Sequence, residues 1–268
     1  MSWSPGPDVE IRVVTEDGSP AAHETVSHLL RRMLQLVEPA FATNRLRALR
    51  HADAEEGQAA QPHRWHSKSE RDRLLVKRLA RTIATDLLAS RFVLLHADAD
   101  VKWSERPSGY EASFRDNFVP VVRAGLLPAR AEPRSPRRTA PAPETRSEEE
   151  IRRCLGRLVL TMPYWTIEAW LYQNTDVALR LCREKYQGRD LQKFLSWQND
   201  RARLDNEEAA ALEQVCLGKH HNLDLASSGY PARDVYEARA SFHAAVEALR
   251  GCAGLLAALS LPPAGSEP

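Results

Sequence analysis

Two aspartates separated by one residue, Asp98 and Asp100, have the type and spacing of residues that could perform chemistry. They follow Arg91–Leu95, whose β-branched and aromatic composition predicts a short buried strand. In an open α/β sheet, ligands bind just beyond the carboxyl ends of the strands, which is where these carboxylates would lie. Two negative charges this close repel each other, so a partly enclosed pair would favour a bound cation.

Acidic residues also follow two other predicted strands. Glu16 comes directly after Glu10–Thr15, and Glu168 follows Arg157–Thr161. Because the carboxyl ends of parallel strands meet at one edge of a sheet, we expect both residues to join the aspartate pair in one crevice. Carboxylate oxygens suit Mg²⁺ or Mn²⁺, since such ions bind one or two protein carboxylates and keep several waters. The predicted ion would orient a water molecule and stabilise the charge that develops on a phosphate group.

A basic residue from the second half of the chain is a candidate for the same site. Lys219, with His220 and His221 beside it, would reach the scissile phosphate or stabilise its charge; the alternative is a lysine in a solvated loop. His96 lies on the strand before Asp98 and is interpreted as an imidazole of the core, or as one that supports a ligand, rather than as a metal ligand.

Helical and strand patterns alternate along the first part of the chain. Apolar residues recur with a helical period in His23–Val37 and in Ser69–Ala89, and Arg45–Arg50 is a further strand candidate. His51–Ser67 is polar and irregular, which predicts a solvated loop. Beyond Asp176 the apolar pattern is helical throughout. This order predicts an α/β fold with a mostly parallel sheet flanked by helices and a C-terminal helical extension.

The same patterns divide the chain into two parts. We expect an α/β domain over residues 8–176 and a helical part packed on it over residues 177–260. Residues 128–146 contain five prolines and five arginines and almost nothing apolar, so they are predicted to form a flexible insertion or linker.

The composition excludes several classes of protein. Charged residues make up 27% of the 268 residues but nearly cancel to a net charge of +1, which excludes a polybasic nucleic-acid binder and permits a local basic face. Neither a membrane-spanning run nor a secretion signal is evident. Four widely spaced cysteines lack the spacing of a metal site and are predicted to be reduced thiols. We therefore expect a cytoplasmic protein.

Two further motifs are VVTEDG (Val13–Gly18) and, later in the chain, VLLHADAD (Val93–Asp100). Together they resemble the TOPRIM domain, which occurs in topoisomerases, DnaG-type primases, recombination proteins and OLD-type nucleases. A third segment, PYWTIEAWLYQNTD (Pro163–Asp176), is similar to the P-x-x-x-x-E-A-W-L stretch of small stand-alone TOPRIM proteins, many of which are encoded in prokaryotic defence or mobile loci. The resemblance covers residues 10–176, and 177–260 only loosely.

The resemblance implies a TOPRIM-like (Rossmann-like) sheet and a role for each acidic residue. Glu16 would act as general acid or base or as a metal ligand, Asp98 and Asp100 as the metal-binding pair, and Glu168 as the additional carboxylate of the subgroup. The opening motif usually reads Glu-Gly, whereas Asp17 intervenes here, and the continuation after Asp100 differs from that of topoisomerases and primases. These departures favour a nuclease.

Three functions follow from these residues as hypotheses. The first is a Mg²⁺- or Mn²⁺-dependent nuclease that cleaves phosphodiester bonds in DNA, or less expectedly RNA, as the effector of a phage-defence system. The second is a non-catalytic or trigger-dependent interaction module that works with an ATPase partner protein. The third is a nucleotide-sugar transferase, since these enzymes also carry an Asp-x-Asp motif at a strand end; it would give Glu16 no role.

Overall fold

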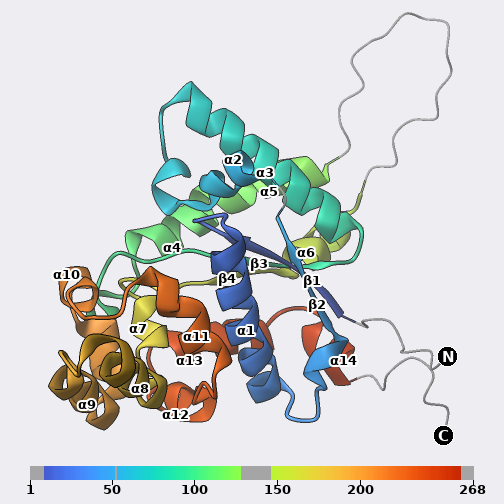
Figure 1. Ribbon diagram of the computed structural model, residues 1–268. Coiled ribbons are helices and arrows are strands. Elements are labelled where there is room, and N and C mark those ends of the chain that lie inside the picture. The colour runs from blue at the N-terminus through green and yellow to red at the C-terminus, as the bar shows by residue number, and fades with distance from the viewer. Residues whose placement is uncertain (1–8, 52, 128–145, 261–268) are drawn as a thin grey trace, which may run out of the picture.

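Four parallel strands form the sheet at the centre of the fold, in the order β2–β1–β3–β4 (Figure 1). The computed structural model describes residues 9–51, 53–127 and 146–260. The strands are β1 (Val9–Thr15), β2 (Leu46–Arg50), β3 (Phe92–His96) and β4 (Leu158–Thr161). Every neighbouring pair is parallel, which confirms the predicted α/β fold with a parallel sheet, flanking helices and a helical C-terminal region.

Helices make up most of the remaining described chain. Those before β4 are α1 (Pro20–Val37), α2 (Ala54–Gly57), α3 (Glu70–Leu88), α4 (Gly109–Ser113), α5 (Val119–Leu126) and α6 (Glu148–Leu155). Those after β4 are α7 (Glu168–Leu171), α8 (Thr175–Tyr186), α9 (Leu191–Asn199), α10 (Ala209–Glu213), α11 (Asn222–Ser227), α12 (Ala232–Glu237), α13 (Ser241–Arg250) and α14 (Leu255–Ser260). Short helical turns include η2 (Gln58–Ala60), η3 (Pro62–Arg64), η6 (Arg201–Asn206), η7 (Lys219–His221) and the π-helical η5 (Phe114–Phe118).

Each face of the sheet is covered by its own hydrophobic cluster. Successive strand residues point to opposite faces, so Val13 packs in the cluster that contains α1 and the C-terminal helices, while Val14 packs in the cluster of α3, α5 and α6. Leu94 and Leu95 divide in the same way. In Figure 1, α3 and α5 lie above the sheet, and α1, α11 and α13 lie below it. The strands are therefore buried on both faces, as is usual for a parallel sheet.

The helices that follow β4 are joined to one another by a buried polar network. Asp205, in η6, is fully buried and accepts hydrogen bonds from the backbone N–H (3.2 Å) and the hydroxyl of Ser241, the first residue of α13. The Ser241 hydroxyl oxygen also accepts a hydrogen bond from Nε1 of Trp170 in α7 (2.5 Å). These contacts connect α7, η6 and α13 inside the cluster that also covers one face of β1.

One local prediction is wrong. His51–Ser67 is not a solvated loop, because it contains α2, η2 and η3 and contributes to the cluster around α3. Trp65 is buried there, and its Nε1 donates a hydrogen bond to the carbonyl oxygen of Ala59 (2.9 Å). A single large apolar side chain thus anchors a segment that is otherwise polar.

Two further predictions concern membrane-spanning segments and the Pro- and Arg-rich residues 128–146. No helix within the described ranges is long and apolar enough to cross a membrane. Of the Pro- and Arg-rich residues 128–146, only Arg146 lies inside the described part of the chain, where its guanidinium donates a hydrogen bond to the carbonyl oxygen of Leu126 (2.7 Å).

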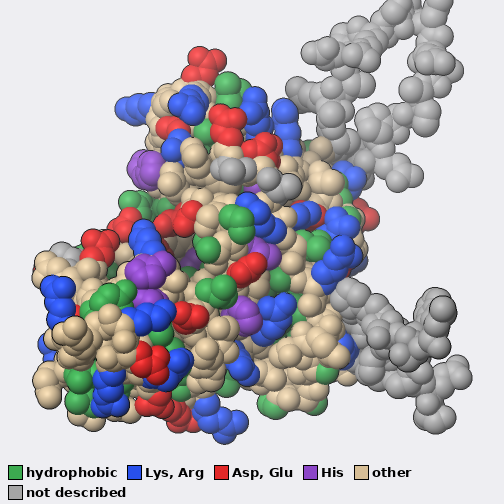
Figure 2. All heavy atoms as spheres, viewed as in Figure 1, with side chains coloured by type: hydrophobic (Ala, Val, Ile, Leu, Met, Phe, Trp, Pro, Cys, Tyr) green, Lys and Arg blue, Asp and Glu red, His purple; other side chains and the backbone are tan. Residues whose placement is uncertain are grey.

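Charges of both signs share the surface. On the face shown in Figure 2, Lys and Arg side chains are interspersed with Asp and Glu side chains. This mixture agrees with the net charge of +1. Attraction of an anionic ligand must therefore come from individual basic residues placed at a site rather than from the overall charge.

Candidate functional site

The register of the sheet aligns the ends of β1, β3 and β4. Thr15 pairs with His96, and His96 pairs with Thr161, so the three strands end in one row. Beyond this row the chain after β3 stays beside the chain after β4, since the N–H of Ala99 donates to the carbonyl oxygen of Pro163 (3.0 Å). The residues that follow each strand, Glu16 among them, are therefore brought to one edge, as predicted.

A tight turn after β1 positions Glu16. The N–H of Gly18 donates to the carbonyl oxygen of Thr15 (3.1 Å), and Gly18 has a φ of 67°, a left-handed conformation that glycine adopts without steric cost. Ser19 then caps α1 by accepting a hydrogen bond from the N–H of Ala22 (3.1 Å). Asp17 thus does not occupy the left-handed position of this turn; the required glycine is the next residue.

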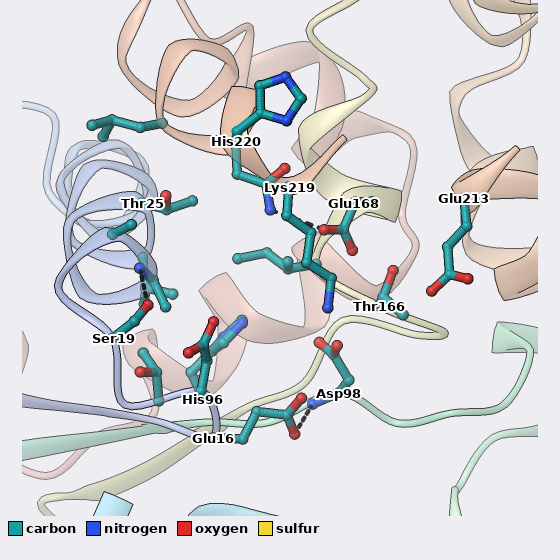
Figure 3. A pocket seen from close by; sticks show the side chains of 18 residues that line it. Glu16, Ser19, Thr25, His96, Asp98, Thr166, Glu168, Glu213, Lys219 and His220 are labelled. Atoms are coloured by element: carbon teal, nitrogen blue, oxygen red, sulfur yellow. Dashed lines mark hydrogen bonds between the residues drawn. The ribbon is translucent and has the colours of Figure 1, made fainter. Parts of the chain in front are cut away.

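Glu16 and Asp98 are in direct contact. The N–H of Asp98 donates a hydrogen bond to Oε2 of Glu16 (3.3 Å), and both side chains are half-buried. They line a cavity of about 420 Å³ between the start of α1, the end of β3, α7 and the η7–α11 segment. Figure 3 shows the two carboxylates at one end of this cavity.

Glu168 and Lys219 reach the same cavity from the C-terminal side. Glu168, in the first turn of α7, is 7% exposed, and its Oε1 accepts a hydrogen bond from Nδ2 of Asn222 (2.9 Å). Lys219 is exposed, and in Figure 3 its amino group points into the space between Glu168 and Asp98. Four of the five predicted site residues therefore line one cavity.

Asp100 is the fifth predicted residue, and it lies outside this lining. It is exposed and has a φ of 54°, and its N–H donates a hydrogen bond to the carbonyl oxygen of Trp165 (3.2 Å). Loss of hydration raises its pKa, and the nearby His63 opposes this shift. The charge of Asp100 still acts on Glu16 and Asp98, whose pKa values it raises.

Burial and mutual repulsion raise the pKa values of the carboxylates Glu16 and Asp98. Burial raises the pKa of Glu16 to about 7; the hydrogen bond from Asp98 opposes this, and the charge of Asp100 adds to it. Burial also raises the pKa of Asp98 well above its usual range, and Glu16 and Glu168 add to the shift. Lys219 lowers the pKa of both residues, so it is the basic group that stabilises their charged forms.

The donor set fits a hard divalent cation that takes few protein ligands. Among the described residues no group of three or more His, Cys, Asp or Glu side chains is arranged to hold a metal ion. Glu16 and Asp98 nevertheless form a pair of carboxylates whose pKa values are raised, first by burial and then by neighbouring acidic residues. Mg²⁺ commonly binds one or two protein carboxylates and completes its shell with waters, which this pair can accommodate.

The segment that carries Lys219 is held in place by side chains from other elements. The Tyr172 hydroxyl donates to the carbonyl oxygen of Leu217 (2.9 Å). The hydroxyl of Tyr186, at the end of α8, lies 3.2 Å from Nε2 of His220 and 2.9 Å from Nε2 of His221. These contacts flank Lys219 on both sides in sequence, so they fix where its side chain starts.

His96 is a neutral residue of the core, as predicted. It is 4% exposed, its Nδ1 lies 3.3 Å from Oγ1 of Thr161, and its ring packs edge-on against Trp170. Burial lowers its pKa to about 3, so it carries no charge at neutral pH. It also lines the cavity that contains Glu16 and Asp98.

Asn222 was not identified from the sequence. It orients Glu168 although 54 residues separate the two in the chain, and its polar neighbours gave no periodic signal. Ser19 and Thr25, at the N-terminal end of α1, also line the cavity. From the sequence, only the position of this helix after β1 could have suggested that they lie near the site.

No protein-family model, no curated protein and no solved structure matches this chain. The relationship to the TOPRIM domain accordingly stays a hypothesis that rests on the motifs around Glu16, Asp98 and Glu168.

Proposed function

We propose that this protein is a Mg²⁺- or Mn²⁺-dependent nuclease of the TOPRIM type that hydrolyses phosphodiester bonds, in DNA rather than RNA. The observation that carries the proposal is the contact between Glu16 and Asp98 at one end of a cavity into which Lys219 also points. Paired carboxylates with a facing ammonium are suited to a substrate that brings both a metal ion and a phosphate.

Each residue has a distinct part in this reaction. Glu16 and Asp98 would hold the ion, which when bound supplies charge neutralisation and a water of lowered pKa. As an alternative to this ligand role, Glu16 would act as the general base that takes a proton from the attacking water. Lys219 would bind a non-bridging phosphate oxygen, and Glu168, oriented by Asn222, would supply an additional carboxylate in the same cavity.

The nucleotide-sugar transferase is the weaker candidate. It would give Glu16 no role, whereas Glu16 contacts Asp98 and lines the same cavity. A thermal-shift panel separates the two proposals, because a transferase would be stabilised by a nucleotide-sugar with Mn²⁺ and a nuclease by the metal with a short oligonucleotide.

The nuclease proposal is tested with purified full-length protein on plasmid, linear and single-stranded DNA and on RNA, each with Mg²⁺, Mn²⁺ or EDTA. We expect cleavage that requires the metal and that is lost in Glu16→Gln. Asp116→Asn is the matched control, since Asp116 is an exposed acid on η5 outside the cavity lining.

A defence effector can require a trigger, so the assay is repeated with the product of any neighbouring ATPase gene and ATP. Failure to cleave any substrate under both conditions would contradict the proposal. Cleavage by Glu16→Gln at the wild-type rate would retain the nuclease and remove Glu16 from its site.

A further inference from the structure

Two of the four cysteines lie against each other although they are far apart in sequence. The Sγ atoms of Cys182, in α8, and Cys216, just before η7, are 2.9 Å apart. A disulfide bond needs an S–S distance of about 2.05 Å, so the two sulfurs have to approach by less than about 1 Å. Both residues carry free thiols in this structure.

The surrounding contacts hold this arrangement. One carboxylate oxygen of Asp190 accepts a hydrogen bond from the N–H of Cys216 (2.6 Å), and the N–H of Asp190 donates to Sγ of Cys182 (3.5 Å). Asp190 thereby fixes both cysteines to the turn between α8 and α9. Cys182 is fully buried, whereas Cys216 is half-buried, so a small reagent reaches Cys216 first.

We propose that Cys182 and Cys216 are a redox-modification site, which a low-molecular-weight disulfide of the glutathione type converts to an intramolecular disulfide. The proposal does not depend on the nuclease assignment, because it rests on the geometry of the two thiols alone.

The reaction consists of two thiol–disulfide exchanges. The Cys216 thiolate attacks one sulfur of the small disulfide, forms a mixed disulfide and releases one small thiolate. The Cys182 thiolate then attacks Sγ of Cys216 and displaces the second small thiolate. The two protons lost by the cysteines are taken up by the two released thiolates, so one small disulfide is reduced as one protein disulfide is formed.

The environment sets the rate of this exchange. Burial raises the pKa of Cys216, and the hydrogen bond with Cys182 and the charge of Asp190 raise it further. Only a small fraction is therefore thiolate at neutral pH, and the exchange accelerates as the pH rises.

The consequence of oxidation falls on the segment that carries Lys219. Cys216 lies three residues before Lys219, and the contacts of this segment with α8 through Tyr186 are non-covalent. A Cys182–Cys216 bond would attach the segment to α8 covalently. Oxidation would therefore restrict the motion of residues 214–221, of which Lys219 and His220 line the cavity.

The test is to equilibrate full-length protein with oxidised glutathione at pH 8, alkylate the remaining thiols under denaturing conditions and map the peptides by mass. We expect two alkylated cysteines, Cys154 and Cys252, and a cross-linked pair of peptides containing Cys182 and Cys216. Cys154→Ala is the matched control and should retain the cross-link, whereas Cys216→Ala should lose it.

The same mixture is analysed after refolding in oxidised glutathione, so that slow access to the folded protein does not hide the reaction. Four free thiols under both conditions would overturn the proposal, as would a stable glutathione adduct on Cys216 or a disulfide that involves Cys154 or Cys252. Hydrogen exchange supplies a second measure: we expect slower exchange of residues 214–221 in oxidised than in reduced protein, and equal exchange would overturn the stated consequence.

Discussion

At the scale of single residues, the carboxylates of the site are placed where they destabilise the metal-free fold. Asp98 is half-buried, and its pKa is raised by burial and by the neighbouring Glu16 and Glu168, so keeping it charged is unfavourable there. Residues selected for chemistry commonly carry such a cost, because a charge that a ligand must neutralise is uncompensated in the ligand's absence.

This cost can be measured with Asp98→Asn. In EDTA at pH 8 we expect the variant to melt a few degrees above the wild type, since about 1–2 kcal/mol of charge burial and repulsion is removed. The rate of any metal-dependent cleavage should also fall. The decrease should exceed the roughly 10–100-fold loss that follows mutation of a residue that only orients a metal ligand. Calorimetry and a cleavage assay check both parts, and a lower melting temperature in EDTA would contradict the repulsion argument.

The sequence was most informative at this scale for residues that directly follow strands. Glu16, Asp98 and Glu168 could be selected because parallel strands end at a common edge, and the register of β1, β3 and β4 brings them there. Asp100 followed from the same rule but lies outside the cavity lining, since the chain has already entered a left-handed turn at that residue. A backbone conformation of this kind has no signal in residue spacing.

At the scale of elements, the η7 segment is positioned by aromatic hydroxyls rather than by a strand or a long helix. Tyr172, which directly follows α7, and Tyr186, the last residue of α8, form hydrogen bonds with it. A polar loop was all that could be predicted for this stretch, because its partners lie 34 to 45 residues away. The packing of helices determines which of them approach, and periodicity does not encode that packing.

The role of this contact is tested by Tyr186→Phe. We expect a loss of about 1 kcal/mol in the free energy of unfolding and a several-fold lower turnover, because Lys219 loses a fixed starting point. Tyr236→Phe is the matched control, because it removes a hydroxyl that donates to Glu247 of α13 (2.7 Å) and neither residue lines the cavity. We expect this variant to lose a similar free energy of unfolding and to keep its turnover. Equal turnover in the two variants would show that the Tyr186 contact is only structural.

At the scale of the whole molecule, the C-terminal helices and the sheet form one hydrophobic body on the α1 face. The fold class could be predicted because alternating strand and helix patterns are local. The buried network of Asp205, Ser241 and Trp170 could not, because nothing local marks Asp205, whose partner Ser241 lies 36 residues away.

This network makes the stability of the whole fold depend on pH. Burial raises the pKa of Asp205 to about 7, above its ordinary 3.8, and the hydrogen bonds from Ser241 oppose the shift. A raised carboxyl pKa stabilises the fold fully below the unfolded value and loses that contribution as the pH rises through the folded value. We therefore expect the free energy of unfolding to fall between pH 4 and pH 7, with Asp205 contributing roughly 4 kcal/mol.

Denaturant titrations at several pH values measure this fall. Glu16 contributes in the same direction, because its pKa is also raised to about 7. Asp205→Asn should therefore flatten the pH profile only in part, and Asp205→Asn combined with Glu16→Gln should flatten it further. An unchanged slope in the first variant would exclude Asp205 as a source of the pH dependence.

Because Lys219 comes late in the sequence, the residues of the candidate site are assembled in a fixed order while the protein is synthesised. Glu16, Asp98 and Glu168 leave the ribosome before Lys219 and before the helices that complete the core beneath β1. Domains fold as their residues emerge, so the nascent chain presents a cluster of acids without its opposing cation and with one face of the sheet uncovered. The complete arrangement forms only after Lys219 and the helices that follow it have been translated.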